Sequence, residues 1–498
     1  MGKIKGIFFL VLVVILVSCK TKQERNTKPN FIFIMVDDLG KEWFSSYGAT
    51  EILTPNIDAF AKKGIMFNNA YSMPQCTPSR IVLITGQYPY NNGWVNHYDV
   101  PRWGLGANFD ADKNPSFAKA LQNAGYKTGV AGKWQINDFR IEPDAMTKAG
   151  FDEFCMWTGY ESGNQPSDKR YWDPYIFTKE GSKTYQGKFG PDIFSDFVID
   201  FMSKNKDNPF FVYYPMVLTH SPFVHTPHEP NVKTKYQKHQ AMVRYTDYII
   251  GKILQHLESS GLSKNTYVVL TTDNGTSPSI IGKRNGVYVR GGKAFLTENG
   301  INAPFLVKTP DSKHFETNAL VDFTDIFPTF LELAGVHNTN SKLDGHSFAK
   351  VLTNNSTKSN RDYILSMGGL PAHTNKEGWV VNALGFRDRV LRNEKYKVYV
   401  DTLKQIHRLY DLENDPYEEN NLYGNVEIEQ VLKTFKSKVD QLPNLDENPK
   451  YTKTKGLPTD VKPEFLDRAV ERLKNRKNNM MPLATEEQFL KLIKANNH

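Results

Sequence analysis

The run Phe31-Ile32-Phe33-Ile34-Met35-Val36 is continuously apolar and is followed directly by Asp37-Asp38. Six apolar residues without polar alternation are typical of a parallel strand that is buried on both faces. In open α/β sheets, ligands bind at the carboxyl ends of the strands. This stretch therefore predicts a buried sheet. It also predicts that Asp37 and Asp38 lie at the ligand-binding edge of that sheet.

Other parts of the chain repeat this form. Three further apolar runs end in polar residues: Tyr126 to Val130 before Lys133, Phe210 to Leu218 before His220, and Tyr267 to Leu270 before Asp273-Asn274. Apolar residues recur at helical spacing in Phe117 to Ala124 and in Gln240 to Ser259, where Gly261 follows as a stop. The alternation predicts an α/β fold, with a doubly wound, mostly parallel central sheet flanked by helices.

The texture of the chain changes after about residue 375. Short strands joined by polar turns are expected at Leu384 to Arg387, Tyr396 to Val400 and Arg408 to Leu412. We therefore expect a catalytic domain over 31–375, a smaller antiparallel subdomain over 376–450 and a helical tail over 451–498. The tail carries two amphipathic segments, Glu464 to Leu473 and Thr485 to Ile493. No internal repeat and no nucleic-acid-binding motif is found.

The first 30 residues have the features of an export signal and a tether. Lys3 and Lys5 precede the apolar run Ile7 to Val17, which is short for a membrane span. Leu16-Val17-Ser18-Cys19 resembles the lipobox of bacterial lipoproteins, which implies a signal over 1–18, a lipidated Cys19 and a tether over 19–30. This predicts a protein of the bacterial cell envelope, anchored in a membrane through Cys19; an ordinary secretory signal or membrane anchor is the alternative.

Composition narrows the class of protein. The chain has 498 residues, of which 39% are hydrophobic, so it can bury a large core and is neither disordered nor fibrous. Apart from Cys19 it has two cysteines, Cys76 and Cys155, too few for a disulfide framework. With Lys3 and Lys5 removed, the net charge of +8 falls by two to +6. A basic surface suits a polyanionic substrate, although a solvated basic surface explains it equally well.

The segment Cys76-Thr77-Pro78-Ser79-Arg80 has the pattern of a helix start. Thr77 can cap a helix, Pro78 fits the first turn, and Gly86 can end it. Cys76 is then expected just before a helix N-terminus, where free N–H groups and the macrodipole favour an anion. Arg80, one turn further on, adds a fixed positive charge.

Cys76 to Arg80 followed by Thr85-Gly86 resembles the signature of type I, formylglycine-dependent sulfatases of the alkaline phosphatase superfamily. The resemblance implies that a formylglycine-generating or sulfatase-maturing enzyme oxidises Cys76 to formylglycine (3-oxoalanine). The hydrated aldehyde has two hydroxyls, one to attack sulfur and one to expel sulfate afterwards. A plain serine would need water to break the resulting ester.

The same resemblance implies a metal site and a set of cationic groups. It assigns Asp37, Asp38, Asp273 and Asn274, together with the oxidised Cys76, to a metal ion. These hard oxygen ligands favour Ca²⁺, with Mg²⁺ as the alternative. Taken alone, Asp-Asp or Asp-Asn-Gly is more often a turn than a metal site.

Four further side chains complete the implied catalytic set with Cys76. Arg80, Lys133 and Lys293 place positive charge where the sulfate oxygens develop negative charge. His220 protonates the leaving alcohol or holds the sulfate, and either His220 or Lys293 aids the departure of the sugar hydroxyl. Asp322, Thr324, Asp325, Pro328 and Asp344 to Ser347 also resemble the family, and we interpret them as helix-capping and packing groups.

Three residues depart from the family pattern. Gln135 stands where a histidine is usual, and glutamine cannot accept a proton at neutral pH. His97 is a speculative substitute for that histidine. Asn299 and Asn302 replace a glycine and an arginine after Lys293, without changing the lysine.

The function that the resemblance implies is hydrolysis of sulfate esters of a sulfated carbohydrate, such as oligosaccharides from algal ulvan, carrageenan or fucoidan-like glycans, or a glycosaminoglycan-like fragment. Aromatic residues, such as Trp94, Trp134, Trp157 and Trp172, suit stacking on sugar rings, although most aromatic residues are core. His225 and His228 are expected in a loop that touches substrate. The alternatives are a phosphate or phosphonate ester hydrolase of the same superfamily and a non-catalytic protein that binds sulfated glycans.

Overall fold

The computed structural model describes residues 28–100, 106–157, 169–337, 342–354, 356–453, 471 and 482–494. Cys19, the signal and almost all of the helix expected at Glu464 to Leu473 lie outside the described residues. Within the described part of the chain, no helix has the length and apolar character to cross a membrane.

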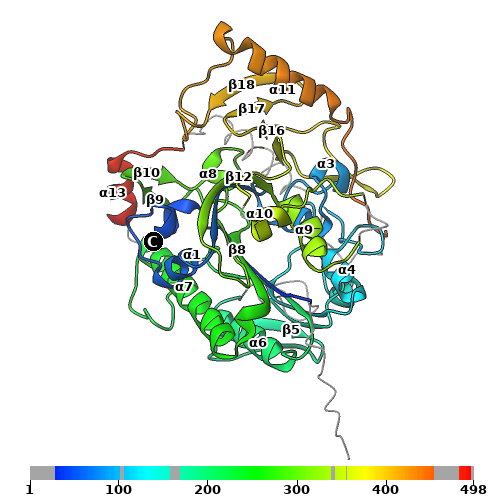
Figure 1. Ribbon diagram of the computed structural model, residues 1–498, viewed down its shortest axis with the longest axis vertical. Helices are drawn as coiled ribbons and strands as arrows, with labels where there is room; N and C mark the ends of the chain where they lie inside the picture. Colours follow the sequence, from blue (N-terminus) through cyan, green and yellow to red (C-terminus); the bar gives the residue numbers. More distant parts are fainter. Residues whose placement is uncertain are drawn as a thin grey trace, which may run out of the picture.

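A ten-stranded sheet forms the centre of the molecule (Figure 1). Its strands follow the order β12-β2-β11-β8-β1-β7-β3-β4-β5-β6. The strand bounds are β1 Asn30–Val36, β2 Ile65–Tyr71, β3 Lys127–Lys133, β4 Glu153–Trp157, β5 Tyr175–Thr178, β6 Gly181–Thr184, β7 Phe210–Pro215, β8 Thr266–Thr272, β11 Phe305–Lys308 and β12 Phe315–Asp322. The run from β8 through β1, β7 and β3 to β4 is parallel, and β11, β5 and β6 are antiparallel to their neighbours. The mostly parallel sheet is confirmed.

Helices cover both faces of this sheet, as a doubly wound fold requires (Figure 1). One face carries α1 Pro55–Ala61, α6 Gly190–Lys204 and α7 Lys235–Ser259; the other carries α2 Cys76–Thr85, α4 Phe117–Asn123, α9 Ile326–Leu333 and α10 Ala349–Asn354. Strand β1 contributes to two cores in alternation: Phe31, Phe33 and Met35 pack toward α4 and α9, whereas Ile32, Ile34 and Val36 pack toward α1, α6 and α7. A strand with period-two side chains and a core on each side must be apolar throughout, which explains its sequence.

Several predicted bounds shift by a few residues. Strand β3 extends to Lys133, so this lysine is itself the last strand residue, and β7 ends at Pro215, so His220 lies in the loop that follows. Helix α7 begins five residues earlier than predicted because Thr234 and Gln237 form a capping box. Further short α-helices and strands are α3 Pro89–Asn92, α5 Ala145–Lys148, β9 Ile281–Arg284, β10 Val287–Arg290, α8 Glu298–Ile301, β14 His373–Thr374 and β15 Val380–Val381.

A smaller antiparallel sheet lies at one end of the molecule, under α11 Glu429–Gln441 (Figure 1). Its order is β13-β16-β17-β18, with β13 Ile364–Met367, β16 Arg389–Arg392, β17 Tyr396–Val400 and β18 Ile406–Asp411. The small C-terminal sheet is confirmed, and its first strand lies upstream of the predicted boundary. The boundaries of the domains themselves stay a prediction.

Two details of the C-terminal region can be compared with the sequence analysis. The strand predicted at Leu384 to Arg387 is wrong, because this backbone bonds to Asp446 instead of a neighbouring strand: Asp446 N donates to Gly385 O at 2.6 Å, and Arg387 N donates to Asp446 Oδ2 at 3.0 Å. The second tail helix is confirmed as α13 Glu486–Lys494, whose Phe489 packs on Tyr236 of α7.

Candidate active site

The carboxyl edge of the central sheet gathers the predicted acidic residues. Asp37 and Asp38 follow β1, and Asp273 and Asn274 follow the neighbouring strand β8. Asp38 N donates to Asp273 Oδ1 at 3.1 Å, and Asn274 Nδ2 donates to Asp38 Oδ1 at 2.8 Å. All four side chains are buried. The sequence correctly predicts that these groups converge, although they are 235 residues apart along the chain.

Each of the three buried carboxylates has a lysine or an arginine within 2.7 Å. Lys133 Nζ lies 2.7 Å from Asp37 Oδ2, Lys293 Nζ lies 2.6 Å from Asp38 Oδ2, and Arg80 Nη2 lies 2.7 Å from Asp273 Oδ2. Arg80 also donates through Nη1 to the Lys133 carbonyl at 2.8 Å, which ties α2 to β3. The three predicted cations therefore belong to one cluster with the predicted acidic residues.

The cluster shifts the ionisation of its members. Burial alone would raise the pKa of Asp37, but Lys133, His220 and Arg80 outweigh burial and bring the pKa far below its usual value. Burial and the neighbouring Asp37 raise the pKa of Asp273. Burial would lower the pKa of Lys293, but Asp38 and Cys76 raise it on balance. Positive and negative groups thus hold one another in place in the absence of bulk water.

Cys76 occupies the first turn of α2 and is buried. The prediction that Thr77 caps this helix is wrong: the N-cap is Gln75, in an extended conformation, and no side chain caps the helix. Ser79 instead secures the helix entry, since its hydroxyl accepts from Met73 N at 3.1 Å and its Oγ lies 2.9 Å from the Gln75 carbonyl. Gly86 ends the helix with φ of 63°, as predicted.

Gln135 faces the candidate nucleophile. The Cys76 thiol donates to Gln135 Oε1 at 3.4 Å, and Gln135 is a buried residue with φ of 61°. Gln135, which stands where the family usually has a histidine, therefore contacts the side chain of the candidate nucleophile Cys76 directly. His97 contacts the residue that precedes Cys76 in the sequence, since its Nδ1 is 2.9 Å from Gln75 Nε2.

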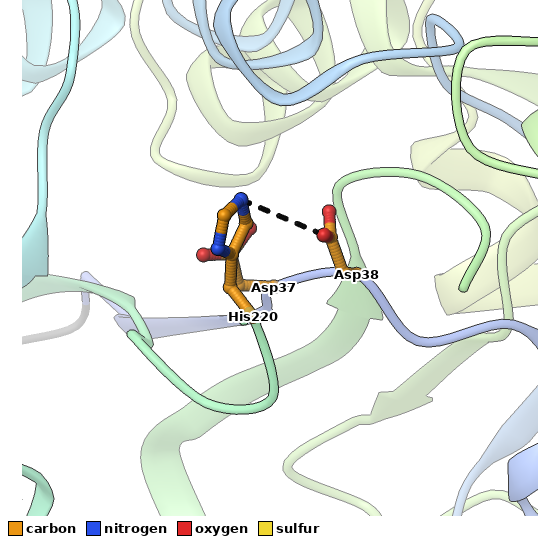
Figure 2. A group of neighbouring side chains, drawn as sticks. All are labelled: Asp37, Asp38 and His220. Carbon is orange, nitrogen blue, oxygen red and sulfur yellow. Dashed lines mark ion pairs between the residues drawn. The ribbon is translucent and has the colours of Figure 1, made fainter. Parts of the chain in front are cut away.

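His220 reaches the carboxylates from the loop after β7 (Figure 2). Its Nε2 lies 3.6 Å from Asp38 Oδ2, and its Nδ1 lies 2.6 Å from the Ser221 carbonyl. A carbonyl can only accept, so Nδ1 carries the proton and Nε2 of the neutral ring faces the site. Burial, with Lys293 and Lys133 next in effect, lowers the pKa of His220 well below its usual value.

The donor set fits a hard divalent cation. Ligand atoms of Asp37, Asp38 and His220 lie within 4.8 Å of one another. Asn274 Oδ1 is buried and accepts no hydrogen bond from any described residue, which is the state expected of an oxygen that waits for a cation. Carboxylate and amide oxygens are the ligands of Ca²⁺ and Mg²⁺. The geometry adds His220 to the neighbourhood of the predicted metal ligands.

The other departures from the family pattern have local explanations. Asn302 stands where the family usually has an arginine, and its Oδ1 accepts from Lys41 Nζ at 2.7 Å. The lysine therefore supplies a positive charge next to this position. Asn299 Nδ2 donates to the Arg290 carbonyl at 2.5 Å. Asp322 caps the turn before α9, and Arg361 pairs with Asp325, which confirms their predicted structural character.

The predicted sugar-binding aromatics divide into two groups. Trp94, Trp134 and Trp157 are buried in the core. Trp172 is partly exposed and stacks on His225 with ring centroids 5.1 Å apart, while His228 packs on Tyr248 at 4.4 Å. Only the second group therefore lies where a substrate could touch it.

Two residues near the cluster have no counterpart in the sequence analysis. The Tyr171 hydroxyl donates to the carbonyls of Val217 and His220 and so fixes the loop that carries His220. Arg170 precedes it and is buried. Both lie in irregular chain without periodicity or motif, so no signal in the sequence points to them.

Fold and site together define an α/β enzyme that is suited to hold a cation and an anionic ester at the carboxyl edge of its sheet. Residues 29–336 match the family profile described as Sulfatase, and residues 290–444 match the profile described as N-sulphoglucosamine sulphohydrolase, C-terminal. The chain belongs to the sulfatase family, whose members are hydrolases that use a metal ion and a formylglycine.

Individual relatives are distant but cover most of the chain. An ulvan-active sulfatase of Formosa agariphila is 26% identical over 473 residues, which cover 87% of this chain and 85% of the relative. An N-acetylglucosamine-6-O-sulfatase of Bacteroides thetaiotaomicron is 25% identical over 529 residues, covering 84% and 87%. Among solved structures, Ps i-CgsB in complex with k-i-k-neocarrahexaose has a TM-score of 0.69 and 25% identity, covering 85% of this chain and 94% of that one.

Proposed function

We propose that this sulfatase removes sulfate from a sulfated carbohydrate, an oligosaccharide derived from an algal or similar polysaccharide, with the oxidised side chain of Cys76 as nucleophile. The observation that carries the proposal is the position of Cys76 in the first turn of α2, four residues before Arg80, whose guanidinium pairs with Asp273 at 2.7 Å and donates to the Lys133 carbonyl at 2.8 Å. The ulvan-active sulfatase and the N-acetylglucosamine-6-O-sulfatase named above support a carbohydrate substrate.

The residues of the chain have separable roles in this proposal. Lys133 and Lys293 bind the sulfate oxygens and offset the negative charge that grows on them. Arg80 holds Asp273 and the end of β3 in place. His220 Nε2 faces the site; once it has taken up a proton, which the anionic ester beside it favours, it donates that proton to the leaving sugar oxygen, while Tyr171 keeps the loop of His220 fixed.

Two added groups complete the proposed site. Asp37, Asp38, Asp273 and Asn274, with the modified residue 76, would hold Ca²⁺, which supplies Lewis-acid charge. The modified Cys76 would supply a hydrated aldehyde with two hydroxyls. Ca²⁺ is preferred to Mg²⁺ because the donor set is rich in oxygen and includes an asparagine carbonyl. Restoring activity with each ion separately after chelation tests this choice.

The cellular setting is also a proposal. The lipobox-like segment before Cys19 supports a lipid anchor in the bacterial envelope, where polymeric substrate is met outside the cytoplasm, after a formylglycine-generating enzyme has acted on Cys76. Labelling with a clickable fatty acid in cells that express the wild type or Cys19→Ala tests the anchor. A label that does not depend on Cys19 contradicts it.

A pair of aryl esters tests the proposed reaction. Wild-type enzyme, produced with a formylglycine-generating enzyme, is expected to release sulfate from an aryl sulfate much faster than phosphate from the matching aryl phosphate, and Cys76→Ala is expected to release neither. Faster release of phosphate would favour a phosphate or phosphonate ester hydrolase. Binding of sulfated oligosaccharides without any release would favour a non-catalytic glycan-binding protein.

A further inference from the structure

Arg170 is a buried cation that the proposed reaction does not use. The residue is 7% exposed, and its guanidinium lies 4.1 Å from the centre of the Trp157 ring. Nε and Nη1 are both buried, and neither donates a hydrogen bond to any acceptor among the described residues. No described carboxylate forms an ion pair with Arg170. Buried polar groups are rarely left in this state, and a buried charge still less often.

The position of Arg170 places this unpaired charge beside the candidate active site. Trp157 ends β4 and stands in register with Lys133, the last residue of β3. The next residue, Tyr171, donates its hydroxyl to the His220 carbonyl, and Arg170 is close enough to His220 to contribute to the lowering of its pKa, after burial, Lys293 and Lys133. The guanidinium therefore lies between the sheet edge that carries Lys133 and the loop that carries His220.

The stacking on Trp157 explains only part of the environment of Arg170. The face of an indole ring attracts a cation, but the N–H groups of a guanidinium point outward in its own plane, so they still need oxygen acceptors. Stacking also fixes the plane of the guanidinium. A fixed planar fork with free donors is suited to bind a carboxylate or sulfate through two parallel hydrogen bonds.

The sulfate ester that is cleaved does not need Arg170 as a binding partner, because other cations of the cluster already bind it in the proposed function. Lys133, Lys293 and Arg80 each have a carboxylate partner. Two of them, Lys133 and Lys293, already receive the cleaved sulfate in the proposed function. Arg170 is an additional cation, reached from the β4 side of the site, and it lacks a partner of its own among the described residues.

We propose that Arg170 binds a second anionic group of the substrate, a carboxylate or another sulfate ester, on the sugar residue that is desulfated or on its neighbour. The inference rests on the proposed function and narrows it: the preferred substrates carry at least two anionic groups close together. Arg170 is then a specificity-determining residue and takes no part in breaking the S–O bond.

Matched substrates test this role. The first pair is a sulfated oligosaccharide that contains a uronic acid and the same oligosaccharide after carboxyl reduction; the second is a disulfated and a monosulfated form of one disaccharide. Wild-type enzyme is expected to prefer the more anionic member of at least one pair. Arg170→Gln should reduce this preference in kcat/KM by about tenfold or more, mainly through KM, because a charge-assisted pair of hydrogen bonds is lost. The pair that responds identifies the anion as carboxylate or sulfate.

Two further variants make the result specific. Arg170→Lys keeps the charge without the fork and should keep part of the preference. Arg408→Gln removes another ring-stacked guanidinium, which lies 4.7 Å from the Tyr399 ring in the C-terminal sheet, and should leave the preference unchanged. If Arg170→Gln does not fold, the comparison of Arg170→Lys with the wild type decides.

The outcomes separate this inference from the function on which it rests. Equal preferences in the wild type, Arg170→Gln and Arg170→Lys, with sulfate still released, would overturn the role of Arg170 and leave the sulfatase proposal standing. Failure of the wild type to release sulfate from any of these substrates and from an aryl sulfate would overturn the proposed function itself.

Discussion

Lys133 pairs with a buried carboxylate of the cluster and, in the proposed function, also binds the sulfate. Its ammonium lies 2.7 and 2.9 Å from the two oxygens of Asp37 and is almost fully buried. Lys133→Ala should lower kcat by about a hundredfold or more, because a cation placed in advance at the developing charge is removed. Steady-state kinetics on an aryl sulfate measures this.

The matched control is Lys119→Ala, which removes an exposed lysine that pairs with Asp112 at 2.9 Å. Such surface pairs contribute little, so activity should be unchanged. A Lys133→Ala enzyme as active as the Lys119→Ala enzyme would remove Lys133 from the proposed reaction.

Cys155 is a buried cysteine with no role in the proposed reaction, and its thiol should be unreactive in the folded protein. It lies within β4, and burial raises its thiol pKa to about 12. Since the thiolate is the reactive form, native protein at pH 8 should not be alkylated at Cys155, whereas unfolded protein should be. Peptide mapping after iodoacetamide treatment measures both states. Rapid alkylation of native Cys155 would show that β4 is less well packed than described.

Glu42 is a buried residue whose hydrogen bond to Thr276 connects the turn after β1 to the loop after β8. Thr276 Oγ1 donates to Glu42 Oε1 at 2.5 Å and accepts from Gly40 N at 2.8 Å. Burial raises the pKa of Glu42 from its ordinary value of 4.5 to about 7. The folded protein therefore binds this proton more tightly than the unfolded chain does. The stability from Glu42 is complete below pH 4.5 and is lost as the pH rises to 7.

Glu42→Gln should remove this pH dependence. Relative to the wild type, the variant should gain free energy of unfolding between pH 5 and pH 8, by about 1 to 3 kcal/mol for a shift of this size. Denaturant titrations of both proteins at the two pH values give the difference. A variant that follows the wild type in parallel across this range would show that Glu42 stays ionised in the folded state.

The four strands β1, β3, β7 and β8 and the converging acidic residues could be predicted because the information is local. A strand buried on both faces must be apolar, and its end is marked by the first polar residues, as at Val36 to Asp37. Helix starts are less certain from sequence, since several residues near Cys76 can cap and only the packing around Ser79 selects among them. Arg170 and Tyr171 could not be found, because they act through tertiary contacts from irregular chain.

The small C-terminal sheet is joined to the rest of the protein by a buried charge cluster. Asp446 accepts from Arg387 Nε at 3.0 Å and from Arg389 Nη2 at 2.7 Å, with all three side chains inaccessible to solvent. Arg387 Nη2 reaches the Pro89 carbonyl at 3.3 Å, on the chain segment that follows α2. One apolar core includes residues of both sheets. The two parts of the molecule should therefore unfold together.

Asp446→Ala tests this connection. Two buried guanidinium groups lose their counter-charge, so the free energy of unfolding should fall by about 3 kcal/mol or more, in one cooperative transition. Calorimetry measures the transition, and Asp362→Ala, at an exposed carboxylate, is the control. Two separate transitions, with activity retained after the first, would show that the C-terminal sheet is an independent unit.

The chemistry proposed for the molecule depends on the state of residue 76. Mass spectrometry of the peptide that contains this residue, taken from active enzyme, is the most direct measurement. We predict the mass of an aldehyde in place of the thiol, with sulfatase activity in proportion to the converted fraction. Full activity in protein whose Cys76 is entirely an unmodified thiol would contradict it.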